Sequence, residues 1–323
     1  MGYSLPYYIV PSIILLILIR KYRESKWGKC RNQVLLNKKV AIITGANSGL
    51  GFEVTKELAS RDAEVILACR TFEKAELTCI HISELLDNSP KLVPMELDLA
   101  SLKSIKHFAD EVKRKYNKIH LLINNAGVSY PRKMTAQTSD GFEIHMGVNH
   151  LGHFYLTQQL LDLLSESSRV VVVASSLHER GEINLSDLNS FAAKKTNLYA
   201  NSKLANIYFA QELARRTKKE KIKVYACCPG WVYTGLFRHY MRWFHFIIVA
   251  PLAFFFMRSP KQGAQTIIYC ATEPSLENET GLLYKDCRYY NRRTIFFDNI
   301  AKQLWEVSDK MIEDALKKSD VQV

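Results

Sequence analysis

Tyr199 and Lys203 lie four residues apart in the chain. On a helix this spacing puts both side chains on one face. A tyrosine hydroxyl, with an ordinary pKa of about 10, can donate a proton to a carbonyl oxygen, and a neighbouring ammonium stabilises the phenolate that remains. The pair therefore fits acid–base chemistry at a carbonyl or an alcohol. Because two such common residues also meet at this spacing by chance, its weight depends on the segments around it.

A glycine-rich turn follows the first strongly apolar run after residue 38. Residues 44–51 read Thr-Gly-Ala-Asn-Ser-Gly-Leu-Gly and lead directly into a segment with helical periodicity. Glycines at such a turn let the backbone approach a pyrophosphate at the positive N-terminus of a helix. A plain tight turn is the alternative, but the strand–turn–helix setting favours a dinucleotide site. The predicted cofactor contacts in the turn are Gly45, Asn47, Ser48, Gly49, Leu50 and Gly51.

The second apolar run ends in Cys69-Arg70-Thr71. An NAD-dependent enzyme usually carries an acidic residue at this point, which hydrogen-bonds the ribose 2′-hydroxyl. An arginine can instead bind a 2′-phosphate through two parallel hydrogen bonds. Arg70 therefore predicts NADP(H) as the cofactor, and a surface arginine at a strand end is the alternative.

From Lys39 onward, short β-branched runs alternate with longer segments of helical periodicity. This alternation predicts an α/β fold, a doubly wound parallel sheet of the Rossmann type in a single domain. Each strand candidate is almost continuously apolar, as expected for a strand buried on both faces. The predicted strands are 40–44, 64–68, 92–97, 120–124, 169–175, 223–228 and 282–284. The predicted helices are 49–61, 101–116, 142–165, 197–217 and 260–271.

The order of the motifs on these elements resembles the short-chain dehydrogenase/reductase family over about residues 39–290. The motifs are the glycine-rich turn, Asn-Asn-Ala-Gly at 124–127, a strand ending in Ser175-Ser176, the Tyr199 and Lys203 pair, and Cys-Pro-Gly at 228–230. The 22 residues between Ser176 and Tyr199 form a longer interval than in many members of the family. Together with Leu177-His178, this interval resembles the retinol dehydrogenase branch.

The resemblance implies catalytic roles for four residues. Tyr199 would donate and accept the proton, and Lys203 would support it and bond the nicotinamide ribose. Ser176 would hold the substrate oxygen, because the family's catalytic serine is usually the second of such a pair, and Ser175 would support the strand end. Asn149, within Val-Asn-His-Leu-Gly-His-Phe at 148–154, would support a water-mediated proton relay.

The resemblance also implies the remaining cofactor contacts. Asp98 would bond the adenine amino group, and the 124–127 motif would line the adenosine ribose, although an asparagine cluster at a strand end can be purely architectural. Thr234, from a Pro-Gly-x-x-x-Thr element, would contact the nicotinamide carboxamide. The other implied contacts are Leu99, Asn125, Ala126, Gly127, Pro229, Gly230 and Val232.

The N-terminal segment has a different composition. Residues 5–19 are apolar apart from a few Tyr, Ser and Pro, and six Lys or Arg follow between positions 20 and 31. This length is borderline for a membrane span, which needs about 20 residues. A signal peptide carries its positive charges before the apolar run, whereas here they follow it. We predict a membrane anchor at 1–19, a basic linker at 20–38 and the catalytic domain at 39–323. A buried first helix of the domain is the alternative.

The basic cluster after the apolar run predicts that the domain faces the cytosol. Seven cysteines without a Cys-x-x-Cys pair fit a reduced compartment. We expect the endoplasmic reticulum membrane, with a mitochondrial or lipid-droplet membrane as alternatives. A second apolar stretch, 243–257, is predicted to be a substrate lid that also contacts the membrane, and core packing is its alternative.

These features favour an oxidoreductase that interconverts a lipophilic carbonyl, such as a retinal-like, steroid or lipid aldehyde or ketone, and its alcohol. A catalytically silent, cofactor-binding membrane scaffold of the same fold is the alternative, although such a protein would usually have lost the tyrosine or the lysine. The net charge of +12 comes without a basic-aromatic patch, so no nucleic-acid partner is expected, and no metal is required. Substrate identity, direction and homo-oligomerisation stay open.

Overall fold

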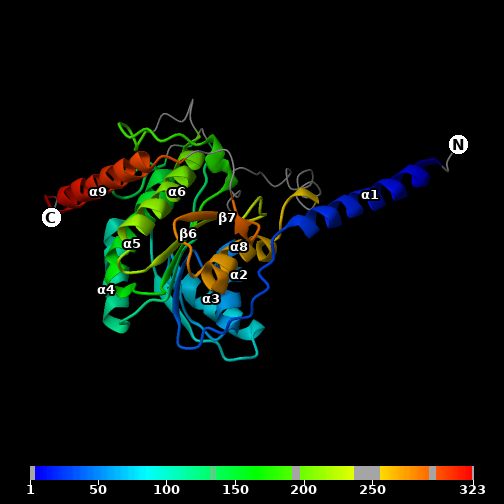
Figure 1. Cartoon of the computed structure of the whole chain (residues 1–323), viewed down its shortest axis with the longest axis horizontal. Helices are drawn as coiled ribbons and strands as arrows, with labels where there is room; N and C mark the ends of the chain where they lie inside the picture. The colour runs from blue at the N-terminus through cyan, green and yellow to red at the C-terminus, as the bar shows by residue number, and fades with distance from the viewer. Residues whose placement is uncertain are drawn as a thin grey trace.

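A β-sheet forms the centre of the molecule in this computed structural model (Figure 1). The structure describes residues 4–131, 134, 136–190, 197–235, 255–290 and 296–321. The strands are β1 Val40–Thr44, β2 Glu64–Cys69, β3 Leu92–Glu96, β4 Leu121–Asn124, β5 Arg169–Val173, β6 Lys223–Cys228, β7 Leu282–Lys285 and β8 Arg288–Tyr289. Within the described residues their order is β3-β2-β1-β4-β5-β6-β7-β8. Neighbouring strands are parallel, except that β8 pairs antiparallel with β7.

Helices cover both faces of this sheet (Figure 1). They are α2 Gly49–Ser60, α3 Phe72–Leu85, α4 Leu102–Lys115, α5 Gly152–Gln159, α6 Leu198–Arg216, α8 Pro260–Thr272 and α9 Asp298–Val321. One buried cluster contains residues of α4, α5, α6 and α9, and the other contains residues of α2, α3 and α8. Ile42 belongs to the first cluster and Ile43 to the second, because successive strand residues point to opposite faces.

The predicted Rossmann-type fold is confirmed, and each predicted strand is present with small shifts at its ends. The predicted helix 142–165 is wrong as a continuous element. It consists of a π-helix at Met146–Leu151, then α5, then a 3₁₀ turn at Leu161–Leu163. The sequence reading also missed α3, β8 and α9. In α3 the apolar side chains lie on both faces, with Ile82 buried and Leu77 exposed, and this blurs the helical period.

The N-terminal segment folds as helix α1, Ser4–Lys26, which projects away from the domain (Figure 1). Its apolar side chains between positions 13 and 19 are exposed. The predicted spanning anchor is not confirmed, since none of the helices that the structure describes combines the length and apolarity needed to cross a bilayer. The helix also continues through position 20, where we predicted that a linker begins. The division into anchor, linker and domain stays a prediction.

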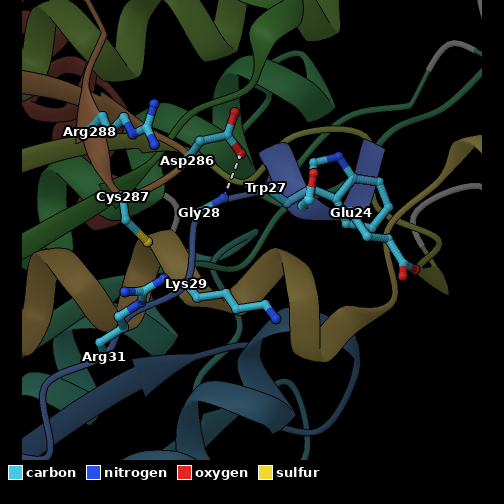
Figure 2. Close-up of a pocket in the computed structure, with 9 residues that line it drawn as sticks. Glu24, Trp27, Gly28, Lys29, Arg31, Asp286, Cys287 and Arg288 are labelled. Atoms are coloured by element: carbon cyan, nitrogen blue, oxygen red, sulfur yellow. Dashed lines mark hydrogen bonds between the residues drawn. The ribbon is translucent and has the colours of Figure 1, made fainter. Parts of the chain in front are cut away.

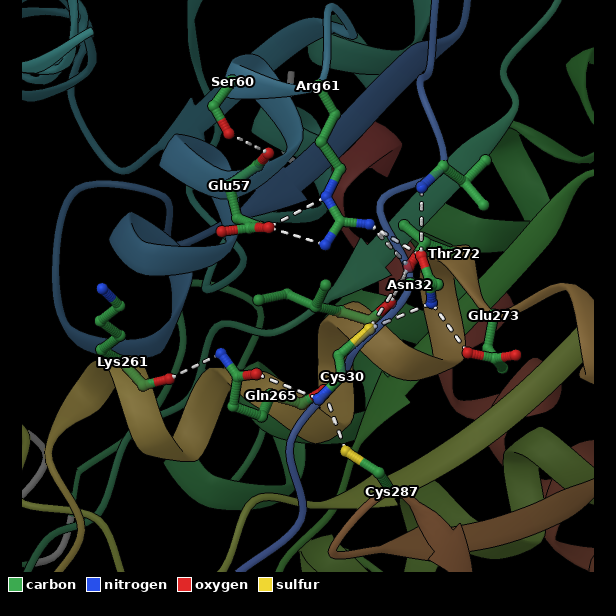
Figure 3. Close-up of polar contacts among 12 residues, drawn as sticks. Cys30, Asn32, Glu57, Ser60, Arg61, Lys261, Gln265, Thr272, Glu273 and Cys287 are labelled. Carbon is green, nitrogen blue, oxygen red and sulfur yellow. Dashed lines mark hydrogen bonds and ion pairs between the residues drawn. The ribbon is translucent and has the colours of Figure 1, made fainter.

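The connection after α1 lies along α8 and is held there by hydrogen bonds (Figure 3). The Cys30 backbone N–H donates to Gln265 Oε1 at 3.1 Å. The Asn32 side-chain amide donates to Glu273 Oε2 at 2.8 Å, and its carbonyl oxygen accepts from Arg61 Nη1 at 2.9 Å. Residues predicted as a linker are therefore attached to both α8 and α2.

A cluster of aromatic rings joins α5, α6 and α9. The ring of Phe154 is fully buried, with its centroid 4.7 Å from that of Trp305 and 5.5 Å from that of Phe209. Burial of such rings is a large source of stability in a core. This cluster therefore fixes α9 on the helices that carry the candidate catalytic residues.

Phe154→Ala should lower the free energy of unfolding by about 3–5 kcal/mol, because a buried ring is lost and a cavity remains. Equilibrium urea denaturation followed by circular dichroism would measure the change. Leu77→Ala on α3, where the side chain is 58% exposed, is the control and should change it by less than about 0.5 kcal/mol. Equal losses in the two variants would contradict this description of the core.

Candidate active site

A cavity of about 760 Å³ lies at the carboxyl ends of the parallel strands. In open α/β sheets, ligands bind at this edge, where the strand order reverses. Here the reversal falls between β1 and β4. The predicted site residues all line the cavity except Gly51 and Asn149, which lie directly behind its wall.

The glycine-rich turn forms the wall between β1 and α2. Gly45 and Gly49 have positive φ angles of 65° and 55°, which glycine adopts without steric cost. A Cβ atom on Gly51 would lie 2.2 Å from the Gly45 carbonyl oxygen. The helix N-terminus can therefore lie directly against the turn, where its first N–H groups have no intrahelical partner. This cradle fits the pyrophosphate of a dinucleotide.

Thr44 joins the ends of β1 and β4 and was missed by the sequence reading. Its Oγ1 atom accepts the backbone N–H groups of Asn125 and Ala126, each at 2.9 Å. The Asn125 side-chain amide donates to the Thr44 carbonyl at 2.8 Å. The Asn125 side chain thus has an architectural task, and its predicted contact with a cofactor stays a prediction.

His153 completes this junction from α5. Its Nε2 lies 2.8 Å from Thr44 Oγ1, and its Nδ1 lies 3.1 Å from the Asn149 carbonyl. Complete burial lowers the pKa of His153 to about 3, so the ring is neutral. A neutral ring that donates from Nδ1 must accept at Nε2, which is satisfied by the Thr44 hydroxyl.

At the adenosine end, Arg70 and Asp98 face each other at the ends of neighbouring strands, with Arg70 Nε 4.0 Å from Asp98 Oδ1. The Arg70 side chain is 53% exposed and therefore accessible to a ligand. Lys74 also lines this end of the cavity. The sequence reading missed it because helix α3 was not predicted. The sequence did contain a signal for this helix, because threonine is a favoured N-cap residue. In the structure the Thr71 side chain caps α3 by accepting the Lys74 backbone N–H.

Tyr199 and Lys203 lie in the first turns of α6 and both line the cavity. The Lys203 ammonium donates to the Val173 carbonyl at 2.9 Å and lies 5.8 Å from the centre of the Tyr199 ring. Burial lowers the pKa of Lys203 to about 8. A Cβ on Gly127 would lie 3.5 Å from this ammonium, so the glycine leaves room beside it.

The two serines after β5 have different surroundings. Ser175 Oγ accepts the Leu177 backbone N–H at 3.2 Å and so caps the following 3₁₀ turn, Ser176–Arg180. Ser176 Oγ is buried and has no hydrogen-bond partner among the residues that the structure describes. A buried hydroxyl without a partner is costly. In a cavity wall, such a group is suited to hold a ligand oxygen.

Asn149 lies within the π-helix, and its side chain is fully buried. Its Oδ1 accepts the Val128 N–H at 2.7 Å, and its Nδ2 donates to the Val128 carbonyl and to Ser202 Oγ. The side chain therefore connects Val128, directly after the 124–127 motif, to Ser202 of α6, and it does not line the cavity. The proton relay that the resemblance implied for Asn149 stays a prediction. π-Bulges often lie at functional sites.

The cavity thus contains the glycine-rich phosphate cradle and the two cations of Arg70 and Lys74. It also contains the Tyr199 phenol, the buried Lys203 ammonium and the Ser176 hydroxyl, which has no partner among the described residues. Such a set can bind a dinucleotide and protonate a carbonyl oxygen. Most of the predicted lid, 243–254, lies outside the described residues. Only residues 255–257 are described, and of these Met257 lines the cavity.

Comparisons with known proteins agree with this arrangement. The sequence profile described as short chain dehydrogenase matches residues 39–243. The chain is 43% identical to retinol dehydrogenase 11 of Mus musculus over 93% of this chain and 94% of the relative. It is 39% identical to retinol dehydrogenase 12 of Homo sapiens over 96% and 95% of the two chains.

Solved structures share the fold. An uncharacterised protein from Mycobacterium paratuberculosis is 32% identical, with a TM-score of 0.69 over 87% of this chain and 95% of that chain. The oxidoreductase yciK from E. coli is 25% identical, with a TM-score of 0.62 over 80% and 98%.

The predicted resemblance to the retinol dehydrogenase branch is therefore confirmed. Members of the family use a nicotinamide cofactor, which the glycine cradle fits. The chain belongs to the short-chain dehydrogenase family and is an oxidoreductase that interconverts alcohols and carbonyl compounds.

Proposed function

We propose that the chain uses NADP(H) to interconvert a retinoid-like or similar lipophilic aldehyde or ketone and its alcohol, with Tyr199 as the proton donor and acceptor. The observation that carries the proposal is the presence of Tyr199, Lys203 and the unpartnered Ser176 hydroxyl in one cavity. Relatives of about 40% identity that are named retinol dehydrogenases support the substrate class.

In the reduction, the bound nicotinamide supplies the hydride. Ser176 Oγ donates a hydrogen bond to the carbonyl oxygen and orients it. Tyr199 donates its proton to this oxygen as negative charge develops there. The buried Lys203 ammonium stabilises the resulting phenolate, and its effect is strong because little water screens it. In the reverse direction, Tyr199 accepts the proton of the alcohol.

Charge at the adenosine end supports NADP(H). Arg70 and Lys74 supply two cations where the ribose of the adenosine half would lie. Arg70 is 4.0 Å from a single carboxylate, and both side chains are substantially exposed, so this ion pair is weak. A 2′-phosphate would give Arg70 a stronger, bidentate partner.

Apolar side chains near Ser176 support a lipophilic substrate. Leu177, Trp231 and Tyr233 line the cavity and are 39%, 61% and 41% exposed, and Met257 lies beside them. Large apolar groups left open to water mark a site for an apolar ligand. The role of 243–257 as a lid belongs to this proposal.

The exposed apolar side chains of α1 support membrane association. Those between positions 13 and 19 are 38–58% exposed, and the exposed cations Lys21 and Lys26 follow them. A helix of this kind can insert its apolar residues into a bilayer while the cations meet the headgroups. We propose that it holds the domain on the cytosolic face of the endoplasmic reticulum, near a substrate dissolved in the lipid.

Tyr199→Phe should reduce kcat for NADPH-dependent reduction of retinal by at least about a hundredfold, because only the proton donor is removed. NADPH affinity, measured by fluorescence titration, should stay within about twofold of the wild type. Tyr289→Phe, on the exposed strand β8, is the matched control and should retain full activity. A Tyr199→Phe variant with nearly normal kcat would disprove the mechanism.

Arg70→Asp should weaken NADPH binding by about tenfold to a hundredfold and leave NADH almost unchanged, because a charge-assisted pair to the 2′-phosphate is lost. Lys74→Ala should act in the same direction with a smaller effect, since lysine is a single point charge. Titrations with both cofactors would measure this, and Lys302→Ala on α9 is the control. Equal changes for the two cofactors would refute the NADP(H) assignment.

The kcat/KM for NADPH should fall as the pH rises through about 8, because the free enzyme loses the Lys203 proton there. The direction follows from burial, which lowers the pKa of Lys203 from its ordinary value of 10.5. Initial rates between pH 6 and pH 10 would test this. Lys203→Arg, which keeps its proton, should show a lower rate without this decline. A decline near pH 8 that persists in Lys203→Arg would assign it to another group.

A further inference from the structure

Arg258 lies between the N-terminal helix and the loop that follows β6. Its side chain is 8% exposed. Its Nη1 donates to the Pro229 carbonyl at 3.1 Å, its Nη2 pairs with Asp286 Oδ1 at 2.5 Å, and its Cζ lies 5.0 Å from the centre of the Trp27 ring. These partners come from the β6 loop, the β7–β8 turn and the end of α1, so a single guanidinium connects three separate segments.

The loop 229–235 is built on this arginine. Gly230 has a φ of 89°, and a Cβ there would lie 2.8 Å from Arg258 Cζ, so its backbone packs directly on the guanidinium. The Arg258 N–H donates to the Trp231 carbonyl at 2.8 Å, and the Arg258 carbonyl accepts the Tyr233 N–H at 2.9 Å. Side chain and backbone of Arg258 thus position the loop together.

This loop lines the cavity, at the end that the family resemblance assigns to the nicotinamide. Thr234 lines the cavity, and a Cβ on Gly49 would lie 3.2 Å from Thr234 Cγ2. The loop therefore meets the glycine-rich turn. A shift of the loop would change the end of the site assigned to the nicotinamide and leave the adenosine end unchanged.

The end of α1 supports Arg258 from the other side. Trp27 lies between two cations, with Arg20 Cζ 4.7 Å and Arg258 Cζ 5.0 Å from its ring centre. Arg20 Nη1 donates to the Met257 carbonyl at 2.6 Å. Figure 2 shows Trp27 next to Gly28, whose N–H donates to Asp286 Oδ1 at 3.4 Å. The same carboxylate oxygen accepts from Arg258, so the two residues directly after α1 contact the arginine through the Trp27 ring and its partner Asp286 through the Gly28 N–H.

We propose that Arg258 is a positioning residue for the nicotinamide-binding loop and that Trp27, directly after α1, holds it in place. The N-terminal helix then contributes to the active site, besides any contact with a membrane. The inference rests on the proposed cofactor site. It follows from the burial of the guanidinium, because a buried cation that loses one of its partners must move or be left partly unsatisfied.

The test compares two ligands of the full-length protein, NADPH and 2′,5′-ADP, which is the adenosine half with its 2′-phosphate. Trp27→Ala should weaken NADPH binding by about tenfold and leave 2′,5′-ADP within about twofold. Trp27→Phe retains a ring face and should recover most of the NADPH affinity. Arg258→Lys keeps a charge for Asp286 but loses the planar fork, so it should behave as Trp27→Ala does.

The matched control is Arg216, which pairs with Glu212 at 2.6 Å and lies 4.6 Å from the Trp305 ring, away from the cavity. Arg216→Lys should leave both affinities unchanged, and thermal melting would compare the stabilities of all variants. Three results would each overturn the inference. The first is that Trp27→Ala weakens NADPH and 2′,5′-ADP binding equally, and the second is that it leaves NADPH binding unchanged. The third is that Arg216→Lys weakens NADPH binding as much as Trp27→Ala does. A wild-type protein that does not bind NADPH would instead overturn the cofactor site, and the inference with it.

Discussion

The active site depends on how closely helix α2 approaches the end of β1. The absence of a side chain at Gly51 allows this approach, since a Cβ would lie 2.2 Å from the Gly45 carbonyl oxygen. The positive end of helix α2 then faces the edge of the sheet at the point between β1 and β4 where the strand order reverses. Thr44 extends the constraint to β4 by accepting two backbone N–H groups. The phosphate cradle and the floor of the catalytic site therefore share one rigid junction.

Beside the Gly127 backbone, the cavity wall holds a buried charge, the Lys203 ammonium, which is unfavourable for stability. Lys203 is nearly fully buried, and burial lowers its pKa to about 8, so the fold holds an ammonium that water would otherwise stabilise. The hydrogen bond to the Val173 carbonyl compensates only part of the free energy lost when the ammonium leaves water, because an ammonium has three donors. The remaining capacity is available to a phenolate or to the ribose of a nucleotide. Stability is given up here for a group that the proposed mechanism uses, as is common at active sites.

A second constraint comes from residues that lie outside the sequence motifs. Trp27, Arg258 and Asp286 lie far apart in sequence, yet they meet beside the loop that closes one end of the cavity. The helix that carries the exposed apolar side chains thus continues into the packing of the site. Leu177 and Trp231, which line the same cavity, are exposed and available to a lipophilic substrate.

The sequence by itself determined the fold class, the glycine-rich turn and the pairing of Tyr199 with Lys203 on one helix, and the structure has both side chains in one cavity. Strands buried on both faces require apolar runs, turns with positive φ favour glycine, and a helix brings residues four apart onto one face. The tertiary structure decided the rest. It directed the Asn149 amide toward Val128 and brought Lys74 into the lining of the cavity that also contains Arg70. It left Ser176 Oγ without a partner among the described residues, while Ser175 capped a turn. It also brought Arg258 to Trp27. The contacts of Asn149 with Val128 and of Arg258 with Trp27 join separate segments, and the local periodicity of a sequence carries no record of them because it reflects only neighbours on the same element.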